Sequence, residues 1–475
     1  MKRGDELNVR LEKFAFEGKS IARVDGMVVF VSGGVPGDEA TVRLSKVTKQ
    51  YAEAHVTSVA SPSGLRVTPR CRYVGECGGC VWQHVEYAAQ LAFKREHVKD
   101  ALERIGGFTG VTVHATLGSE AVYYYRNKME FSFGEKWIRR TEFQGNAATL
   151  AMRDERERFA LGLHVLRRFD KVLDLDECHL QSERSYRIVN AVRAFCLQEQ
   201  LSIYSTITHS GYLRNLAIRE SVNTDECMVN LVTSDDRADV MRRLAERLVA
   251  EFPSITTVVN NITQRKAQVA IGDVEKVYHG PGFITERIGK RTYRISANSF
   301  FQTNTRQAER LYDTVLSLAR LRPDDRVFDL YSGTGTIALH IADAVREVVG
   351  IEAVASAVED ARRNARTNNV ENCTFILGDL KEKLFRDTRW LEGRPVPSLV
   401  IIDPPRAGMH EHVTRSLLEL HPERIVYVSC NPATQARDLK LLCENSAYRI
   451  VEVQPVDMFP HTYHIENVVS LIRQS

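Results

Sequence analysis

A cysteine directly after a short apolar segment is the residue best suited to covalent chemistry. Residues 425–428 (IVYV) are β-prone and predict a buried strand, which ends abruptly at Ser429. Pro432 cannot donate to a strand ladder and holds Asn431 out of helical geometry. Open α/β sheets bind ligands at the carboxyl ends of their strands. Cys430 is therefore a candidate nucleophile, although a free cysteine is often only a small buried hydrophobic residue.

Four strand-like segments upstream of this cysteine end in a carboxylate or a glycine-rich turn. The segment 326–330 leads into YSGTGT (331–336), an arrangement that lets a ligand approach the backbone and a helix N-terminus. The next three segments end at Glu352, Asp379 and Asp403. Such carboxylates can accept the hydroxyls of a ribose or meet the amino group of an adenine. Each alone could equally cap a helix, but the series resembles a class I S-adenosylmethionine methyltransferase.

The residue after the Asp-Pro-Pro sequence indicates which atom is methylated. Many amino-group methyltransferases have an aromatic residue there, whereas this chain has Arg406 and then a cysteine one strand later. That combination favours methylation of carbon. C5 of uracil becomes nucleophilic once a thiolate adds to C6, and the C5 proton must then leave before the cysteine is eliminated. The candidate base is Glu466, and His461 and His464 are alternatives.

A cysteine cluster indicates a metal site. Cys71, Cys77 and Cys80 lie in CRYVGECGGC, whose glycines let the backbone wrap tightly around a bound group. Three thiolates do not complete a tetrahedral site, and Cys178 in a polar loop is the candidate fourth ligand. Zinc and an iron–sulfur cluster both accept four thiolates, so spacing does not decide between them. Unliganded thiols are the third interpretation.

The elements before the catalytic half divide into two groups. Residues 6–60 alternate apolar and polar positions between glycine turns, and five short strands in about 55 residues predict an OB-like barrel. Residues 86–105 have helical periodicity and end at a Gly-Gly pair, and we expect this helix to pack on the catalytic half. Tyr123–Lys128 mixes aromatic and basic residues, which can stack bases and hold phosphate or simply form a packed strand edge.

Composition limits the class of protein. A chain of 475 residues with 43% hydrophobic and 26% charged residues is typical of a globular protein with several domains. The net charge is only +3, so any nucleic-acid contact must come from local patches. We find no apolar run of the roughly 20 residues that span a bilayer and no N-terminal signal core. Nine cysteines without such a signal favour a reducing, cytoplasmic location.

The complete series of motifs resembles the RumA/TrmA-type RNA uracil-5-methyltransferases. The resemblance is close over residues 298–475, and it rests on FFQTN, DLYSGTGT, GIE, GDL, IDPPRAG, VSCNPAT and FPHTYHIENV. The first 62 residues resemble a TRAM domain, an RNA-binding barrel. The cysteine pattern resembles the 4Fe-4S site of these enzymes, which implies that the iron ligands are Cys71, Cys77, Cys80 and Cys178.

The resemblance also implies an α/β fold in three domains. These are a TRAM barrel (1–62), a central α+β iron–sulfur domain (63–290) and a Rossmann-like class I methyltransferase domain (291–475). Cys430 is implied as the nucleophile and Glu466 as the base in forming 5-methyluridine from S-adenosylmethionine. The residues implied to line the donor or base site are Gln302, Tyr331, Thr336, Glu352, Asp379 and Asp403. Thr336 stands where the ribosomal-RNA member has Asn, which weakens the expected contact.

The substrate implied is RNA, with no membrane and no stable protein partner. The barrel and the four cysteines resemble the branch that methylates 23S ribosomal RNA, because the tRNA branch lacks both. A tRNA uracil-5-methyltransferase is the first alternative. A noncatalytic RNA-binding or redox-sensing iron–sulfur protein and a cytosine-5-methyltransferase are the others. For methylation, the target base must leave its stack, so we expect base flipping.

Overall fold

The computed structural model describes residues 1–137, 155–166, 168–266, 272–385 and 395–474. The N-terminal part is one curved sheet with strand order β1-β5-β6-β4-β3-β2, in which β1 also contacts β3. Its strands are β1 (Glu6–Arg10), β2 (Lys13–Phe14), β3 (Ser20–Val24), β4 (Met27–Ser32), β5 (Glu39–Val47) and β6 (Tyr51–Ser61). There are six strands where the sequence predicts five, because the two-residue β2 is too short to produce a periodic signal.

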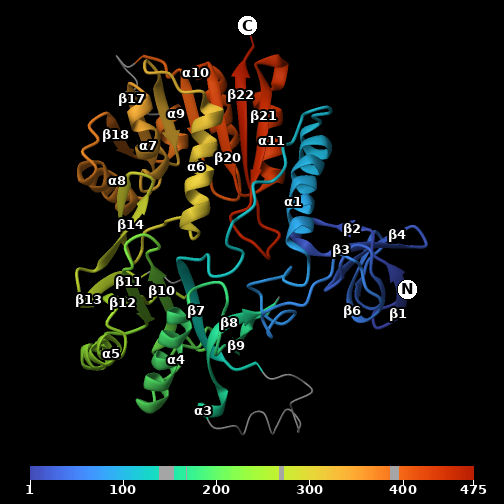
Figure 1. Cartoon of the computed structure of the whole chain (residues 1–475), viewed down its shortest axis with the longest axis vertical. Helices are drawn as coiled ribbons and strands as arrows, with labels where there is room; N and C mark the ends of the chain where they lie inside the picture. The colour runs from blue at the N-terminus through green and yellow to red at the C-terminus, as the bar shows by residue number, and fades with distance from the viewer. Residues whose placement is uncertain (138–154, 167, 267–271, 386–394, 475) are drawn as a thin grey trace.

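A long helix, α1 (Tyr87–Ala101), follows the barrel and the cysteine segment in the chain. It continues as a wider turn over Leu102–Gly106 and ends at Gly107, whose φ of 76° is left-handed. The side chains of Val98 and Leu102 share a hydrophobic core with Leu439 of the C-terminal half. Figure 1 shows α1 standing beside the C-terminal sheet with the barrel at its foot.

The central part is a seven-stranded sheet with the order β13-β12-β11-β10-β7-β8-β9, in which only β11 and β12 are parallel. Its strands are β7 (Lys128–Glu135), β8 (Phe159–Val165), β9 (Arg168–Asp174), β10 (Leu213–Glu220), β11 (Cys227–Thr233), β12 (Ile255–Ile262) and β13 (Val274–His279). Its helices are α3 (Glu155–Arg158), α4 (Glu183–Gln198) and α5 (Ala238–Glu251), and α4 and α5 share one core with the sheet. Lys128 begins β7, whereas Tyr123–Asn127 lies in the irregular segment before it.

The C-terminal part is a second seven-stranded sheet with the order β18-β17-β16-β19-β20-β22-β21. Its strands are β16 (Arg326–Leu330), β17 (Glu347–Glu352), β18 (Cys373–Leu377), β19 (Leu399–Ile402), β20 (Arg424–Ser429), β21 (Tyr448–Val456) and β22 (Glu466–Arg473), and the hairpin of β14 (Phe283–Ile288) and β15 (Arg291–Ser296) precedes them. The first five are parallel, and β22 is antiparallel to both of its neighbours. Every residue of β20 is buried, as expected for a strand covered on both faces.

Helices cover both faces of this sheet. The helices are α6 (Thr305–Ala319), α7 (Thr336–Ile341), α8 (Ala355–Thr367), α9 (Leu380–Phe385), α10 (Glu411–Leu420) and α11 (Pro432–Leu442). The first three share one core with the sheet, while the last three and α1 share the core on the other face. Short 3-10 turns occur at Phe16–Gly18, Ala342–Ala344 and Glu444–Ser446. Among the described residues, we find no helix with the length and apolarity needed to cross a membrane.

A buried ion pair joins three elements of this sheet at the edge where β20 begins. The guanidinium of Arg424 donates to the Asp325 carboxylate and to the carbonyls of Ala319 (2.7 Å) and Arg320 (2.7 Å). Asp325 is 1% exposed and Arg424 is 7% exposed. Removing one member of a buried pair leaves the other charge without compensation, so loss of either partner alone is expected to destabilise the fold.

We predict that Arg424→Met lowers the free energy of unfolding by about 3–5 kcal/mol, because Asp325 loses its buried counter-charge. Urea denaturation followed by circular dichroism measures the change. Arg322→Met is the matched control, since Arg322 and Glu423 form an exposed pair at 3.2 Å that contributes about 1 kcal/mol or less. Equal effects of the two substitutions would contradict the prediction.

Candidate active site and cysteine pocket

The order and direction of the strands bring most of the predicted site residues to one edge of the C-terminal sheet. The five parallel strands have their carboxyl ends there, and the antiparallel β22 has its amino end there. The residues at or just beyond these strand ends are Tyr331, Glu352, Asp379, Asp403, Cys430 and Glu466. Carboxyl ends of parallel strands are where open α/β sheets bind ligands.

The register between β20 and β22 places the predicted nucleophile next to the predicted base. Ser429, the last residue of β20, pairs with Asn467. Cys430 follows this last pair on one side and Glu466 precedes it on the other, and Glu466 is near enough to raise the pKa of the Cys430 thiol. Asn431 then caps α11, where its side chain accepts the Ala433 N–H at 3.1 Å. The strand therefore ends at Cys430 because the next residues begin a helix.

Burial and one nearby cation set the charges at this pair. Burial raises the pKa of the Cys430 thiol to about 12; Glu466 adds to this rise, and the Arg406 guanidinium opposes it. Burial also raises the pKa of Glu466 well above its usual value, with Asp403 adding and Arg406 again opposing. Arg406 donates to Nδ1 of His464 at 3.1 Å, and burial lowers the pKa of His464 to about 4, so this imidazole is neutral.

Arg406 has no role in the sequence prediction beyond its place in the Asp-Pro-Pro-Arg sequence. In the structure its guanidinium lies within electrostatic reach of both Cys430 and Glu466. A cation there favours the thiolate form of the cysteine, which is the nucleophilic form. The signal that could have identified it is the replacement of an aromatic residue by arginine at that position.

Two further carboxyl groups lie at the same edge, on the buried Asp329 and the half-buried Asp403. Burial raises the pKa of Asp403 to about 7. Burial, with Asp403 as the second cause, raises the pKa of Asp329 to about 8. Asp329 Oδ2 accepts the Ala338 N–H at 3.2 Å in the first turn of α7, whereas Oδ1 is buried without a hydrogen-bond partner in the described residues. Asp329 is not among the predicted site residues.

The predicted donor-site residues surround the glycine-rich turn. The Glu352 carboxylate accepts the N–H groups of Gly333 (3.0 Å) and Val354 (2.8 Å), which ties the turn to the end of β17. Tyr331 is half-buried with a left-handed φ of 63°. A Cβ added at Gly333 would meet no atom within 4 Å, so this turn borders open space. Such a turn lets a ligand approach the backbone closely.

The other three predicted donor-site residues, Asp379, Thr336 and Gln302, make ordinary structural hydrogen bonds. Asp379 is exposed and accepts the Lys381 N–H at 2.8 Å at the start of α9, so the helix-cap interpretation applies to it. Thr336 begins α7, and its hydroxyl accepts the Tyr312 O–H at 3.1 Å. Gln302 lies before α6, and its backbone carbonyl accepts a hydrogen bond from Asn127 at 2.8 Å.

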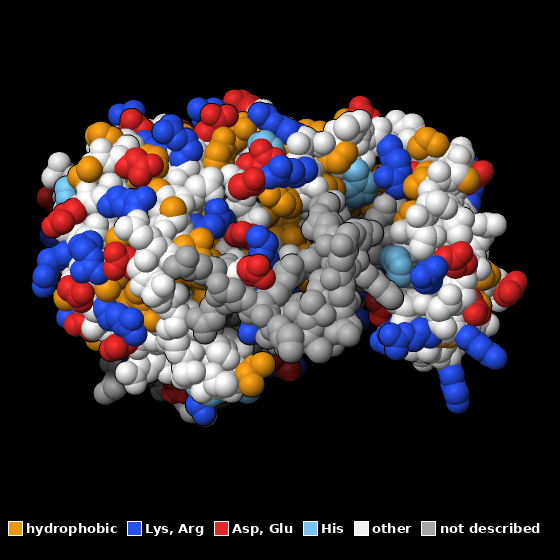
Figure 2. Space-filling model, turned by 90° about the horizontal axis from the view of Figure 1, so that it is seen from below, with side chains coloured by type: hydrophobic (Ala, Val, Ile, Leu, Met, Phe, Trp, Pro, Cys, Tyr) orange, Lys and Arg blue, Asp and Glu red, His pale blue; other side chains and the backbone are white. Residues whose placement is uncertain are grey.

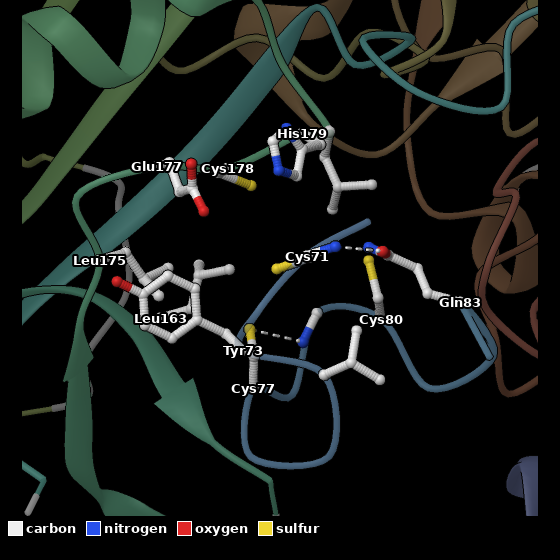
Figure 3. A pocket seen from close by; sticks show the side chains of 13 residues that line it. Cys71, Tyr73, Cys77, Cys80, Gln83, Leu163, Leu175, Glu177, Cys178 and His179 are labelled. Atoms are coloured by element: carbon white, nitrogen blue, oxygen red, sulfur yellow. Dashed lines mark hydrogen bonds between the residues drawn. The ribbon is translucent and has the colours of Figure 1, made fainter. Parts of the chain in front are cut away.

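The four candidate ligand cysteines line one small pocket in the central part. Figure 3 shows the sulfurs of Cys71, Cys77, Cys80 and Cys178 pointing into the same space. In the described parts of the chain, no three or more His, Cys, Asp or Glu side chains are arranged to hold a single metal ion. The predicted 4Fe-4S cluster therefore stays a prediction, while the convergence of the distant Cys178 on the other three is a feature of the fold.

Burial favours the neutral thiols in this pocket, and one buried cation opposes that effect. Burial, with the neighbouring sulfurs contributing, raises the pKa of Cys77 and Cys80 to about 12, which disfavours the thiolates that bind metals. The Arg126 guanidinium opposes the rise in the pKa of Cys80 and of Cys178. Nε of Arg126 is buried and has no hydrogen-bond partner among the described residues. A buried cation beside four thiols fits an anionic group bound by the cysteines.

Aromatic and basic side chains lie beside this pocket. The Arg70 guanidinium lies over the rings of Tyr123 (5.5 Å) and Tyr124 (5.0 Å), and Tyr123 packs on His461 with ring centroids 4.6 Å apart. On the face shown in Figure 2, Lys and Arg side chains are interspersed with Asp and Glu. Local groups such as Arg70 with its two tyrosines are better suited to contact RNA than a broad basic field.

Comparison with known proteins gives the same family at three levels. Residues 220–474 match the tRNA (uracil-5-)-methyltransferase family, and residues 1–57 match the TRAM domain. An uncharacterized RNA methyltransferase of Chlorobaculum tepidum is 44% identical over 99% of this chain and 97% of the relative. One from Porphyromonas gingivalis is 42% identical over 98% of this chain and 100% of the relative.

A solved structure is similar over nearly the whole chain. It is the Pyrococcus abyssi tRNA (uracil-54, C5)-methyltransferase in complex with S-adenosyl-L-homocysteine, which is 30% identical, with a TM-score of 0.75 over 98% of this chain and 100% of that one. The predicted α/β methyltransferase fold with an N-terminal TRAM domain is thereby confirmed. The motifs, the strand order and these relatives agree: the chain belongs to the RNA uracil-5-methyltransferase family.

Proposed function

We propose that this protein forms 5-methyluridine in RNA with Cys430 as nucleophile, Glu466 as base and S-adenosylmethionine as methyl donor. The observation that supports this most strongly is the position of Cys430 and Glu466 beside each other, directly beyond the last pair of β20 and β22 at this edge of the sheet. Donor binding at this edge is supported by the turn at Gly333, which borders open space. The solved relative holds S-adenosylhomocysteine, the form of the donor that has lost its methyl group.

The proposed reaction begins at the thiolate of Cys430. Its sulfur bonds to C6 of uracil, and the electron pair of the C5–C6 double bond moves toward C5 and O4. The Arg406 guanidinium, which opposes the rise in the pKa of Cys430, favours this thiolate. The bound donor supplies an electrophilic methyl group to C5. Glu352 and the turn after β16 orient the donor.

Glu466 completes the reaction by removing the proton from C5. The electron pair of the C5–H bond re-forms the C5–C6 double bond, and the sulfur of Cys430 leaves as a thiolate. A carboxylate with a raised pKa is a stronger base than an exposed one, which suits removal of a carbon-bound proton. The substrate must place both faces of the uracil ring in the site, so the base is flipped out of its stack.

The proposed substrate is 23S ribosomal RNA. The four converging cysteines are the feature that supports this branch of the family, since the tRNA enzyme of known structure matches 98% of this chain and the barrel therefore does not separate the two branches. A tRNA is the second candidate, because the solved relative methylates uracil 54 of tRNA. Incubation of the protein with labelled donor and unmodified forms of both RNAs, followed by mapping of the modified nucleotide, decides between them.

The proposed group in the cysteine pocket is a 4Fe-4S cluster held by Cys71, Cys77, Cys80 and Cys178. It is supported by the four sulfurs that face one space and by the buried Arg126 beside them. A cluster takes one thiolate at each iron corner, so its ligands need not meet at a single metal ion.

We predict that protein purified without oxygen contains about four iron atoms per chain, and that Cys178→Ser loses most of them. Metal analysis and visible absorption measure the content. Cys443→Ser is the control, because Cys443 lies outside the pocket and is expected to leave the iron content unchanged. A content of one zinc ion and no iron per chain would contradict the proposal that the pocket holds a 4Fe-4S cluster.

We predict that Cys430→Ala binds donor normally but forms no 5-methyluridine, because no thiolate adds to C6. Glu466→Gln is expected to accumulate a covalent enzyme–RNA adduct, since the C5 proton stays in place. Denaturing gels detect the adduct, and calorimetry measures donor binding. Cys443→Ala serves as the matched control with normal activity. Turnover in Cys430→Ala would refute the assignment of the nucleophile.

We predict that the rate of C5 proton release rises with pH well above the usual range for a glutamate. The base must be ionised, and its folded-state pKa is raised, so activity is gained as pH rises through that raised pKa. Arg406→Gln removes a cation that lowers this pKa, so the rise is expected to move to higher pH. Tritium release from RNA labelled at uracil C5 gives the profile. A rate independent of pH above about 5.5 would contradict a raised pKa.

A further inference from the structure

The loop between β21 and β22 is held by residues from a different part of the chain. This loop, residues 457–465, directly precedes Glu466. Lys94 of α1 is fully buried, and its Nζ donates to Asp457 Oδ1 at 2.5 Å and to the carbonyl of Phe459 at 3.1 Å. The Tyr87 hydroxyl, also on α1, donates to the other carboxylate oxygen of Asp457 at 2.8 Å.

A buried glutamine of the same helix fixes the middle of the loop. Gln90 Oε1 accepts the backbone N–H of His461 at 2.9 Å, and Nε2 lies 3.2 Å from Nδ1 of the same histidine. Nε2 also donates to the carbonyls of Trp82 (3.1 Å) and Val85 (2.8 Å). Gln90 therefore connects the loop to the segment that follows the cysteine cluster.

The segment after Cys80 bonds the loop directly as well. The backbone N–H groups of Val81 and Trp82 both donate to the carbonyl of His461, at 3.0 and 2.9 Å. The Tyr125 hydroxyl donates to the carbonyl of Pro460, the residue before His461, at 3.1 Å. His461 has a left-handed φ of 65°, which a non-glycine residue keeps only when its surroundings hold it there.

We propose that Lys94 and Gln90 are positioning residues, which fix the loop 457–465 and thereby the base Glu466, and that the backbone after Cys80 shares this task. The inference rests on the proposed function, in which Glu466 removes the C5 proton. Replacing a buried ion pair by apolar residues is often neutral for stability, so a buried Lys–Asp pair at this place is better explained by the geometry it imposes on the loop. In this account the cysteine pocket affects catalysis by holding the loop, through the N–H groups of Val81 and Trp82 that donate to the His461 carbonyl, and not by electron transfer.

The decisive variant is Lys94→Met, which keeps the length of the side chain and removes its charge. We expect kcat to fall about 100-fold with the donor dissociation constant unchanged, because the base is displaced while the donor site is intact. As in Glu466→Gln, the covalent RNA adduct should accumulate, since the step that is slowed is proton removal. Lys99→Met is the matched control on the exposed face of the same helix, and it should behave as wild type.

Hydrogen–deuterium exchange of the full-length protein provides a readout that needs no RNA. We expect amides of residues 457–466 to exchange faster in Lys94→Met and in Gln90→Met, with exchange of β16–β19 unchanged. Gln90→Met tests the same loop without creating an unpaired charge. The double variant Lys94→Met/Asp457→Asn removes both charges of the pair and should stay close to the activity of Lys94→Met, because the loop still lacks its contact with Lys94 of α1. Cys80→Ser should also accelerate exchange in residues 457–466.

Three outcomes would overturn the inference. One is wild-type exchange of residues 457–466 in both Lys94→Met and Gln90→Met. The second is a loss of activity in Lys94→Met without accumulation of the covalent adduct. The third is a loss of donor binding by Lys94→Met in parallel with its loss of activity. Either of these two results would indicate general damage to the fold. If the wild-type protein methylates no RNA, the proposed function fails, whereas the exchange comparison still decides whether α1 positions the loop.

Discussion

The antiparallel pairing of β22 with β20 is the constraint on which the rest of the site depends. The five parallel strands end at one edge of the sheet, and the turns that follow them place their side chains there. β22 runs the opposite way and begins at that edge, so its first residue, Glu466, lies near Cys430 without any change of chain direction. A parallel strand in this position would place the carboxylate at the far edge of the sheet, one strand length away.

Burial changes the proton affinity of the acidic groups at this edge of the sheet. Three carboxyl groups, on Asp329, Asp403 and Glu466, have raised pKa values because they lie in a low-dielectric edge of the sheet. Arg406 opposes the rise for Glu466 and for the thiol of Cys430. Uncompensated buried carboxyl groups favour a cationic ligand, and the sulfonium of S-adenosylmethionine has that charge.

Local patterns in the sequence predict much of the fold, but few of the long-range contacts that hold the site residues in place. The strand ends, the cysteine turn and α1 are readable because each depends on periodicity or turn chemistry over a few residues. The pair of Lys94 and Asp457 is not readable, since 363 positions separate its members and neither belongs to a motif. The need for a fourth ligand makes Cys178 the candidate partner of Cys71, Cys77 and Cys80, but the sequence does not identify the metal, because zinc and iron accept the same ligands.

The central claim is that the sulfur of Cys430 bonds to C6 of the target uracil. RNA that carries 5-fluorouridine tests it directly, because fluorine at C5 cannot leave as a proton does and the adduct is trapped after methyl transfer. Protease digestion and mass spectrometry then locate the crosslink. The expected result is a methylated fluorouridine attached to the peptide that contains Cys430. A crosslink at another cysteine, or methylation of normal RNA with no crosslink to the fluorinated RNA, would contradict the claim.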